Sequence, residues 1–204
     1  MMEHIVSKDI YKKLGKKLDN LSVRAPYNET FYCILRELCS IEEADILIKM
    51  PYRVSSLDRV AKITRCEKSK LRKILESLCE KALVTDFYVK ESYYYQPSPI
   101  YIGMFDVSMM VSEKKLDIKK LSRLLYEYLH EYFGDNSFFT ANFGKGEQVS
   151  FMRTLPHEET IKAADGVEIL DYEKATAIIK QSNKFAVGLC SCRREKEKYR
   201  KKDM

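Results

Sequence analysis

Two cysteines near the end of the sequence have the spacing of metal ligands. Cys190 and Cys192 are separated by one residue and are followed by Arg193 and Arg194. On an extended segment, residues i and i+2 point to the same side, so both thiolates can face one metal ion or cluster. Neighbouring arginines lower the pKa of a thiol and balance the charge of bound thiolates. The pair predicts a metal or cluster site at Cys190 and Cys192 with Arg193 beside it; the alternative is two small residues that close a strand.

A four-ligand zinc or iron–sulfur site needs more than these two thiolates. The other cysteines, Cys33, Cys39, Cys66 and Cys79, lie singly in predicted helices or in the turn between them. We interpret them as small buried hydrophobic residues of a protein in a reducing compartment. The three histidines have no metal-like spacing, and no Ser/His/Asp order has a supporting context. We therefore expect the chain to have no catalytic activity of its own.

The sequence contains no apolar run as long as about 18 residues, so it predicts no membrane span. Its first residues mix acidic and basic side chains and lack the apolar core of a secretory signal. We therefore expect a cytoplasmic protein with no membrane contact.

A basic helix is the second candidate site, in a chain of net charge +6. Its apolar positions recur at i, i+3, i+4 and i+7 and predict a helix over residues 68–80. The first half of its opposite face carries Lys68, Ser69, Lys70, Arg72 and Lys73. In helix-turn-helix proteins this half meets base edges, and arginine or lysine there pairs with guanine or phosphate. The alternative function is a DNA-binding transcriptional regulator with a cysteine-based redox or metal sensor; a lysine face that serves only solubility is the simpler interpretation.

The elements around this helix have the order of a winged helix. A shorter amphipathic helix precedes it from Ser56 to about Ile63, and we expect Ser55 to cap that shorter helix. The turn between the two helices has Arg65 where a glycine is often found. After the basic helix, the runs LVTDFYV and SYYYQP flank Lys90 and Glu91 and predict a β-hairpin. Successive tyrosines of the second run point to opposite faces of a strand, so we interpret them as sheet packing and not as a base-stacking platform.

Further helices are predicted on both sides of this unit. Apolar residues from Ser7 to about Leu21 predict an extension that packs on the unit or on a second copy, which would give a homodimer. We expect Asn28 to cap the next helix, and Ser40 with Glu43 to form the capping box of a short third one. Downstream, a long amphipathic helix is predicted from Leu116 to Phe133.

Helical and extended patterns alternate in the last part of the sequence. We expect strands at 149–156 and 167–170, a helix after Asp171 and a buried strand at 185–189, which together indicate an α/β arrangement. The predicted class is thus α+β, with a winged helix-turn-helix domain followed by a smaller α/β domain. The predicted divisions are an N-terminal helical extension over 1–25, the winged-helix domain over 26–99, and an α/β domain over 100–204 that ends in the Cys-x-Cys-Arg element.

Five segments in this order also resemble a known family. They are CSIEEADILIKMP, LESLCEKALV, QPSPIYIGMFD, RTLPHEETI and ILDYEKATAIIKQSNKFAVGLCSCR, of which the last is the most specific. From about Tyr27 to Arg194 the chain resembles bacterial and archaeal 4Fe–4S ferredoxin-like proteins that begin with a winged-helix domain. The resemblance implies a redox or electron-transfer role for the complete protein, with a 4Fe–4S cluster and a redox partner protein.

The same resemblance assigns roles to the end of the sequence. It implies that Cys190 and Cys192 are cluster ligands and that Arg193 is a charge-balancing neighbour, while the rest of the chain is a docking or interaction module. In that family further cysteines follow the Cys-x-Cys-Arg element, whereas no cysteine follows Cys192 here. The chain is then either a piece of a longer protein or a short relative, and without thiolates from elsewhere it holds no cluster by itself.

Overall fold

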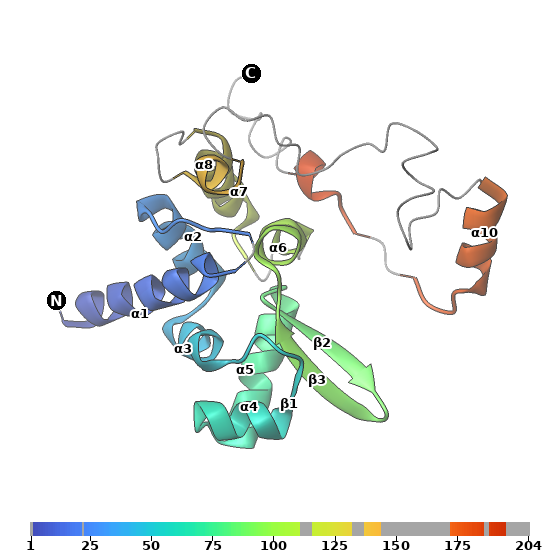
Figure 1. The fold of residues 1–204 in the computed structure, drawn as a ribbon, viewed down its shortest axis with the longest axis horizontal. Helices are drawn as coiled ribbons and strands as arrows, with labels where there is room; N and C mark the ends of the chain where they lie inside the picture. The colour runs from blue at the N-terminus through green and yellow to red at the C-terminus, as the bar shows by residue number, and fades with distance from the viewer. Residues whose placement is uncertain are drawn as a thin grey trace.

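The protein has a mixed α+β fold in which helices pack at one end of a small three-stranded antiparallel sheet, and the hairpin of that sheet projects away from them (Figure 1). The computed structural model describes residues 2–21, 23–110, 116–131, 137–143, 172–185 and 188–194. The α+β class predicted from the sequence is therefore confirmed.

Three helices begin the chain, and their N-termini follow the predicted caps. Helix α1 (Met2–Asp19) precedes α2 (Glu29–Leu38), whose first turn is capped by Asn28: its Oδ1 accepts from the Phe31 amide at 2.8 Å. Helix α3 (Ile41–Lys49) begins with the predicted capping box, in which Ser40 and Glu43 bond each other's amides reciprocally. These local signals satisfy amides that a helix cannot satisfy internally.

Helices α4 (Leu57–Thr64) and α5 (Lys68–Glu80) follow, with the length that the apolar spacing predicts for α5. Arg65 ends α4 in the left-handed region at φ 55°, the conformation that glycine adopts most easily. The expected cap of α4 is wrong by one residue: Ser56 caps it, because Ser55 is held in strand β1 (Ser55–Ser56) opposite Tyr95.

The predicted hairpin is present. Strands β2 (Val84–Val89) and β3 (Ser92–Pro97) pair so that Val89 lies opposite Ser92, and the sheet order is β1-β3-β2. Lys90 and Glu91 both have positive φ, as a two-residue hairpin turn requires. The second of the three tyrosines in β3 faces away from the other two, as strand alternation predicts.

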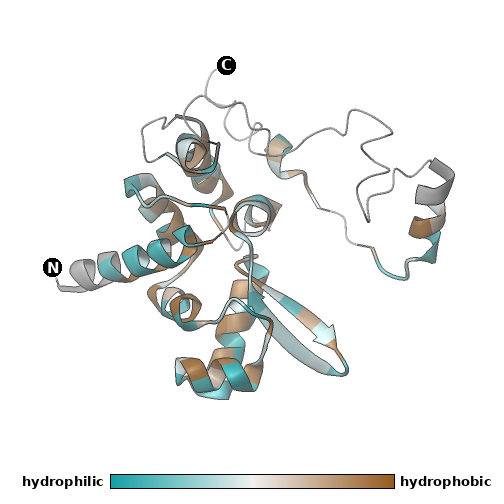
Figure 2. Cartoon of the chain, in the orientation of Figure 1, coloured by the Kyte–Doolittle hydropathy of each residue, from teal (hydrophilic) through white to brown (hydrophobic). Residues whose placement is uncertain are grey.

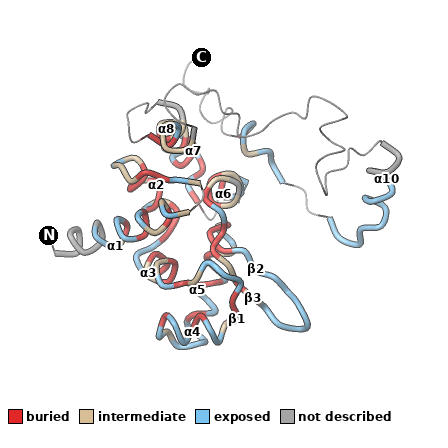
Figure 3. Tube along the Cα trace, in the orientation of Figure 1, coloured by how far each residue is buried: buried red, intermediate tan, exposed pale blue. Residues whose placement is uncertain are grey.

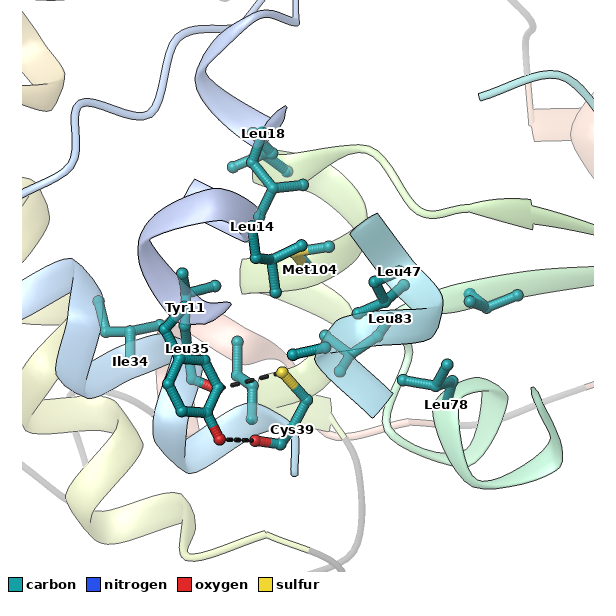
Figure 4. Close-up of a cluster of buried hydrophobic side chains, with 14 of the residues drawn as sticks. Tyr11, Leu14, Leu18, Ile34, Leu35, Cys39, Leu47, Leu78, Leu83 and Met104 are labelled. Atoms are coloured by element: carbon teal, nitrogen blue, oxygen red, sulfur yellow. Dashed lines mark hydrogen bonds between the residues drawn. The ribbon is translucent and has the colours of Figure 1, made fainter. Parts of the chain in front are cut away.

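One continuous cluster of buried side chains joins the helices to the sheet and to the residues that follow it. Figure 3 shows buried segments running through α2, α3 and α5, and Figure 4 shows part of the cluster. There the Tyr11 hydroxyl donates to the Cys39 carbonyl at 2.8 Å. Ile100 and Met104, on η1 (Ile100–Val107), belong to the same cluster. The boundary predicted between residues 99 and 100 thus falls within continuous packing, and the division into domains stays a prediction.

The long helix predicted downstream changes its winding. It begins as α7 (Ile118–Tyr126) and continues as a π-helical turn, η2 (Glu127–Glu131). In this turn Tyr128 is fully buried, whereas the neighbouring Leu129 is only partly buried. The Tyr128 ring stacks on Phe31 with centroids 5.1 Å apart, and its hydroxyl donates to the Pro26 carbonyl at 3.0 Å.

The secondary-structure elements that the described residues form after β3 are all helical. They comprise η1, α6 (Ser108–Met110), α7, η2, α8 (Phe138–Phe143), α10 (Tyr172–Gln181) and a single turn at 191–194. The strands predicted at 149–156 and 167–170 lie outside the described residues. The strand predicted at 185–189 is wrong where it is described: Phe185 and Leu189 form no strand and are 66% and 65% exposed.

Across the described ranges, every helix is too short or too polar to cross a lipid bilayer.

Candidate functional site

Cys190 stands at the start of the helical turn over 191–194. The backbone amide of Arg194 donates to the Cys190 carbonyl at 2.9 Å, which closes the first turn. The expectation of an extended segment here is therefore wrong. The cause is local, because the sulfur at the first position of a helical turn can accept from amides that have no partner in the turn.

The environment of the Cys190 sulfur favours the thiolate. Its pKa is lowered first by the backbone N–H of Arg193, then by the N–H and the thiol of Cys192 and by the positive charge of Arg193. Both cysteines are exposed. The two predicted ligands thus lie at one helical turn, and the positive charge of Arg193 contributes to the lowered pKa of Cys190.

Two side chains attach this turn to the body of the protein. Arg194 is only 7% exposed, and its guanidinium donates to the Met109 carbonyl at 2.9 Å. The Ser191 hydroxyl donates to Asp106 Oδ1 at 3.3 Å. Arg194 is therefore an anchor and not, as the sequence suggested, a second charge beside the thiols. No pattern in the sequence indicates these contacts, since the partners are 85 residues apart.

The donor set at this turn is incomplete for a metal or cluster. Within the described part of the chain, no group of three or more His, Cys, Asp or Glu side chains is placed to hold a metal ion. The remaining cysteines lie in the helical body, where burial raises the pKa of Cys39 and of Cys79 to about 12. A four-ligand site would need two further ligands besides these two exposed thiols.

The second predicted site, on the first half of α5, is exposed but largely paired with acidic residues. Lys68 Nζ lies 2.8 Å from Asp58 Oδ1, and Lys70 forms an ion pair with Glu42. The Ser69 hydroxyl donates to Glu67, which also caps the helix. Arg72 lines a groove that also contains several carboxylates, and Lys73 is exposed near Glu67. The charge of these exposed side chains is therefore partly neutralised by the chain itself.

Comparison with known proteins found no match among family models, curated proteins or solved structures. The geometry of the two sites is therefore the basis for a functional proposal.

Proposed function

We propose that this chain is the winged-helix and α/β portion of an iron–sulfur, ferredoxin-like redox or electron-transfer protein. In it the chain acts as a docking or interaction module and contributes Cys190 and Cys192 to a 4Fe–4S cluster. One observation carries the proposal: two exposed thiols lie on one helical turn, where the backbone N–H groups of Arg193 and Cys192 lower the pKa of Cys190. Thiolates are the usual protein ligands of such clusters, which transfer single electrons.

The arrangement of the first half of the chain supports the winged-helix part of this proposal. Helix α3, strand β1, helices α4 and α5, and then the hairpin of β2 and β3 follow one another in the order expected for that fold. Helix α5 packs on the hairpin through buried residues such as Leu78 and Val84.

The residues at the helical turn have separable roles in this proposal. Cys190 and Cys192 would bind iron, and backbone amides with the Arg193 charge would offset the negative charge of the thiolates. Ser191 and Arg194 hold the turn on the segment that follows the hairpin. The missing thiolates would come from a redox partner protein, a second copy or further residues of a longer protein. Because thiolates must stay reduced, the proposal places the protein in the cytoplasm.

Anaerobic reconstitution with ferrous iron and sulfide tests the ligand assignment. The complete chain should acquire visible absorbance, alone or with the protein that supplies the other thiolates, and the Cys190→Ser/Cys192→Ser variant should not. A matched variant, Cys33→Ala/Cys66→Ala, removes two half-buried thiols of the helical body and should keep the colour. Colour that survives the first variant, or that is lost equally in both, would contradict the assignment.

A DNA-binding regulator is the alternative, and the exposure of Lys68, Lys70, Arg72 and Lys73 on the first half of α5 favours it. The ion pairs of Lys68 with Asp58 and of Lys70 with Glu42 oppose it, since each pair must open before its lysine can bind a phosphate. Protein–DNA affinity falls steeply with salt because bound counterions are released. If micromolar protein shifts no duplex at about 50 mM salt, the regulator is excluded.

A further inference from the structure

A groove lies between helix α5 and the hairpin. It has a volume of about 650 Å³ and is lined by residues of α5, the start of α4 and one face of β2 and β3. Ligand sites in proteins commonly enclose about 300–1,000 Å³. None of its lining residues belongs to residues 190–194, the turn that carries Cys190 and Cys192 and is called the cysteine turn below. The groove is therefore a separate candidate site.

The groove is acidic although the chain is basic overall. Its lining includes the carboxylates of Glu76, Glu80, Asp86 and Glu91, and that of Asp58, which is paired with Lys68. Among the described residues that line it, Arg72 is the one cationic side chain. Burial raises the pKa of Cys79 and of Tyr95 on its wall, and the charges of Asp86 and Glu76 raise both further. The negative charge of the groove therefore acts on its interior and is not confined to the rim.

The carboxylates do not converge as the ligands of one ion do. No three of them, in the part of the chain that the structure describes, are placed to hold a metal ion. They lie instead on three elements, α4, α5 and the hairpin. Negative charges spread along a groove match several positive charges spread along an extended chain.

Tyrosine rings add a second attraction for cations. Tyr93 and Tyr95 line the groove, and the Tyr88 ring packs against Tyr93 with centroids 4.9 Å apart. Tyr88 and Tyr93 are 65% and 53% exposed. Figure 2 shows hydrophobic residues near the tip of the hairpin, beyond the part that packs on the helices. The faces of such rings attract lysine and arginine side chains.

We propose that this groove binds a lysine- or arginine-rich segment of a partner protein. The cationic side chains pair with Glu76 and Asp86 on opposite walls and lie over Tyr93. This inference names the chemistry of a docking partner and so deepens the docking role proposed above. It uses no residue of the cysteine turn, and peptide binding is measured without a cluster. If cluster binding fails, peptide binding by the groove can still be tested, and the reverse is also true.

Fluorescence anisotropy of a labelled peptide of alternating lysine and glycine tests the proposal. The complete chain should bind it at about 50 mM salt and lose affinity as salt is raised. It should not bind a matched glutamate–glycine peptide. The Glu76→Gln/Asp86→Asn variant should bind the cationic peptide about tenfold more weakly. The control Asp9→Asn/Asp45→Asn removes two exposed carboxylates of α1 and α3 outside the groove and should change affinity less than about twofold.

A charge-reversal variant keeps the test decisive. Glu76→Lys/Asp86→Lys should bind the glutamate–glycine peptide in place of the cationic one, with an unchanged far-ultraviolet circular dichroism spectrum. Equal weakening in the groove and control variants would show attraction by net charge alone and overturn the proposal. So would absence of cationic-peptide binding, or self-association of the chain that is lost in the groove variant, which would assign the groove to a second copy.

Discussion

The helical body and the cysteine turn treat their polar groups in opposite ways. In the body, the Glu43 carboxylate is buried and held by three residues: the Ser40 amide, the Ser77 hydroxyl and Lys81 Nζ, the last at 2.7 and 2.8 Å. In the turn, the Cys190 sulfur is exposed and held mainly by amides of the next residues. The stability of the fold therefore depends on the charge of Glu43, whereas the Cys190 sulfur is exposed to solvent and free to react.

The difference shows how stability and chemistry are divided in this protein. Burial alone would raise the pKa of Glu43, but the hydrogen bonds from Lys81, Ser40 and Ser77 outweigh burial and lower it. Those partners come from α3 and from the C-terminal end of α5, so the carboxylate links two helices. The cysteine turn contacts the body through Ser191 and Arg194, while the side chains of Cys190 and Cys192 are exposed. Substitutions of these two cysteines should therefore change reactivity and leave stability nearly unchanged.

The largest expected contrast is in thiol reactivity. The pKa of Cys190 lies below its ordinary value of 9.0, whereas burial raises that of Cys39 to about 12. Each pKa unit changes the thiolate fraction tenfold, so the fractions differ by about a thousandfold or more at neutral pH. Alkylation of the folded protein by iodoacetamide, followed by peptide mass spectrometry, should label Cys190 and not Cys39. Equal labelling rates at Cys190 and Cys39 would contradict the predicted difference in thiol reactivity.

The Glu43→Gln substitution should produce the largest loss of stability. It leaves Lys81 opposite a neutral amide in a buried site, which costs about 3 kcal/mol of the free energy of unfolding. Urea denaturation measures this loss. The matched Glu42→Gln substitution breaks an exposed ion pair with Lys70 and should cost less than about 1 kcal/mol. Alkylation of Cys190 should be the same in both variants, and a similar loss in both would refute the special role of Glu43.

Stability should also depend on pH through the same carboxylate. The pKa of Glu43 is lowered in the folded state, so its contribution is fully present above its ordinary value of 4.5 and is lost as the pH falls through the lower, folded-state value. The stability difference between wild type and Glu43→Gln should therefore shrink as the pH falls below 4.5. A difference that stays constant over this range would show that the charge is not responsible.

The smallest expected effect is a gain in stability at Arg65. Its left-handed backbone conformation, φ 55° and ψ 33°, strains any residue other than glycine, so Arg65→Gly should stabilise the protein by up to about 1 kcal/mol. Lys62→Gly, in the interior of the same helix, should destabilise it by about 1 kcal/mol. Thermal unfolding distinguishes the two signs, and neither variant should change the alkylation of Cys190.

Local signals explain which parts of the fold the sequence predicts. Asn28 and Ser40 cap their helices with groups only three residues away, and the apolar spacing of α5 needs no distant partner. The π-helical turn is not predictable in this way. It depends on the packing of Tyr128 against Phe31, which lies on another helix.

The candidate site likewise has features that the sequence predicts and features that it does not. The spacing of Cys190 and Cys192 singles them out as candidate ligands, and Arg193 is adjacent to them. All three candidate residues can therefore be named from the sequence. The geometry of the turn does not follow from this spacing, which is the same whether the segment is extended or begins a helical turn. The anchoring by Arg194 and the buried pair of Glu43 with Lys81 join residues far apart in sequence, for which composition and periodicity give no signal.

The hydrogen bond from Tyr128 to Pro26 has a consequence for how the chain folds. The two residues are 102 positions apart, so joining them closes a long loop. The entropy of closing a flexible loop of that length amounts to about 4 kcal/mol. Helices α1 to α3 and the hairpin can form through much shorter loops and should do so first. The π-helical turn would then dock last, which makes the ring stack of Tyr128 on Phe31 a reporter of the final folding step.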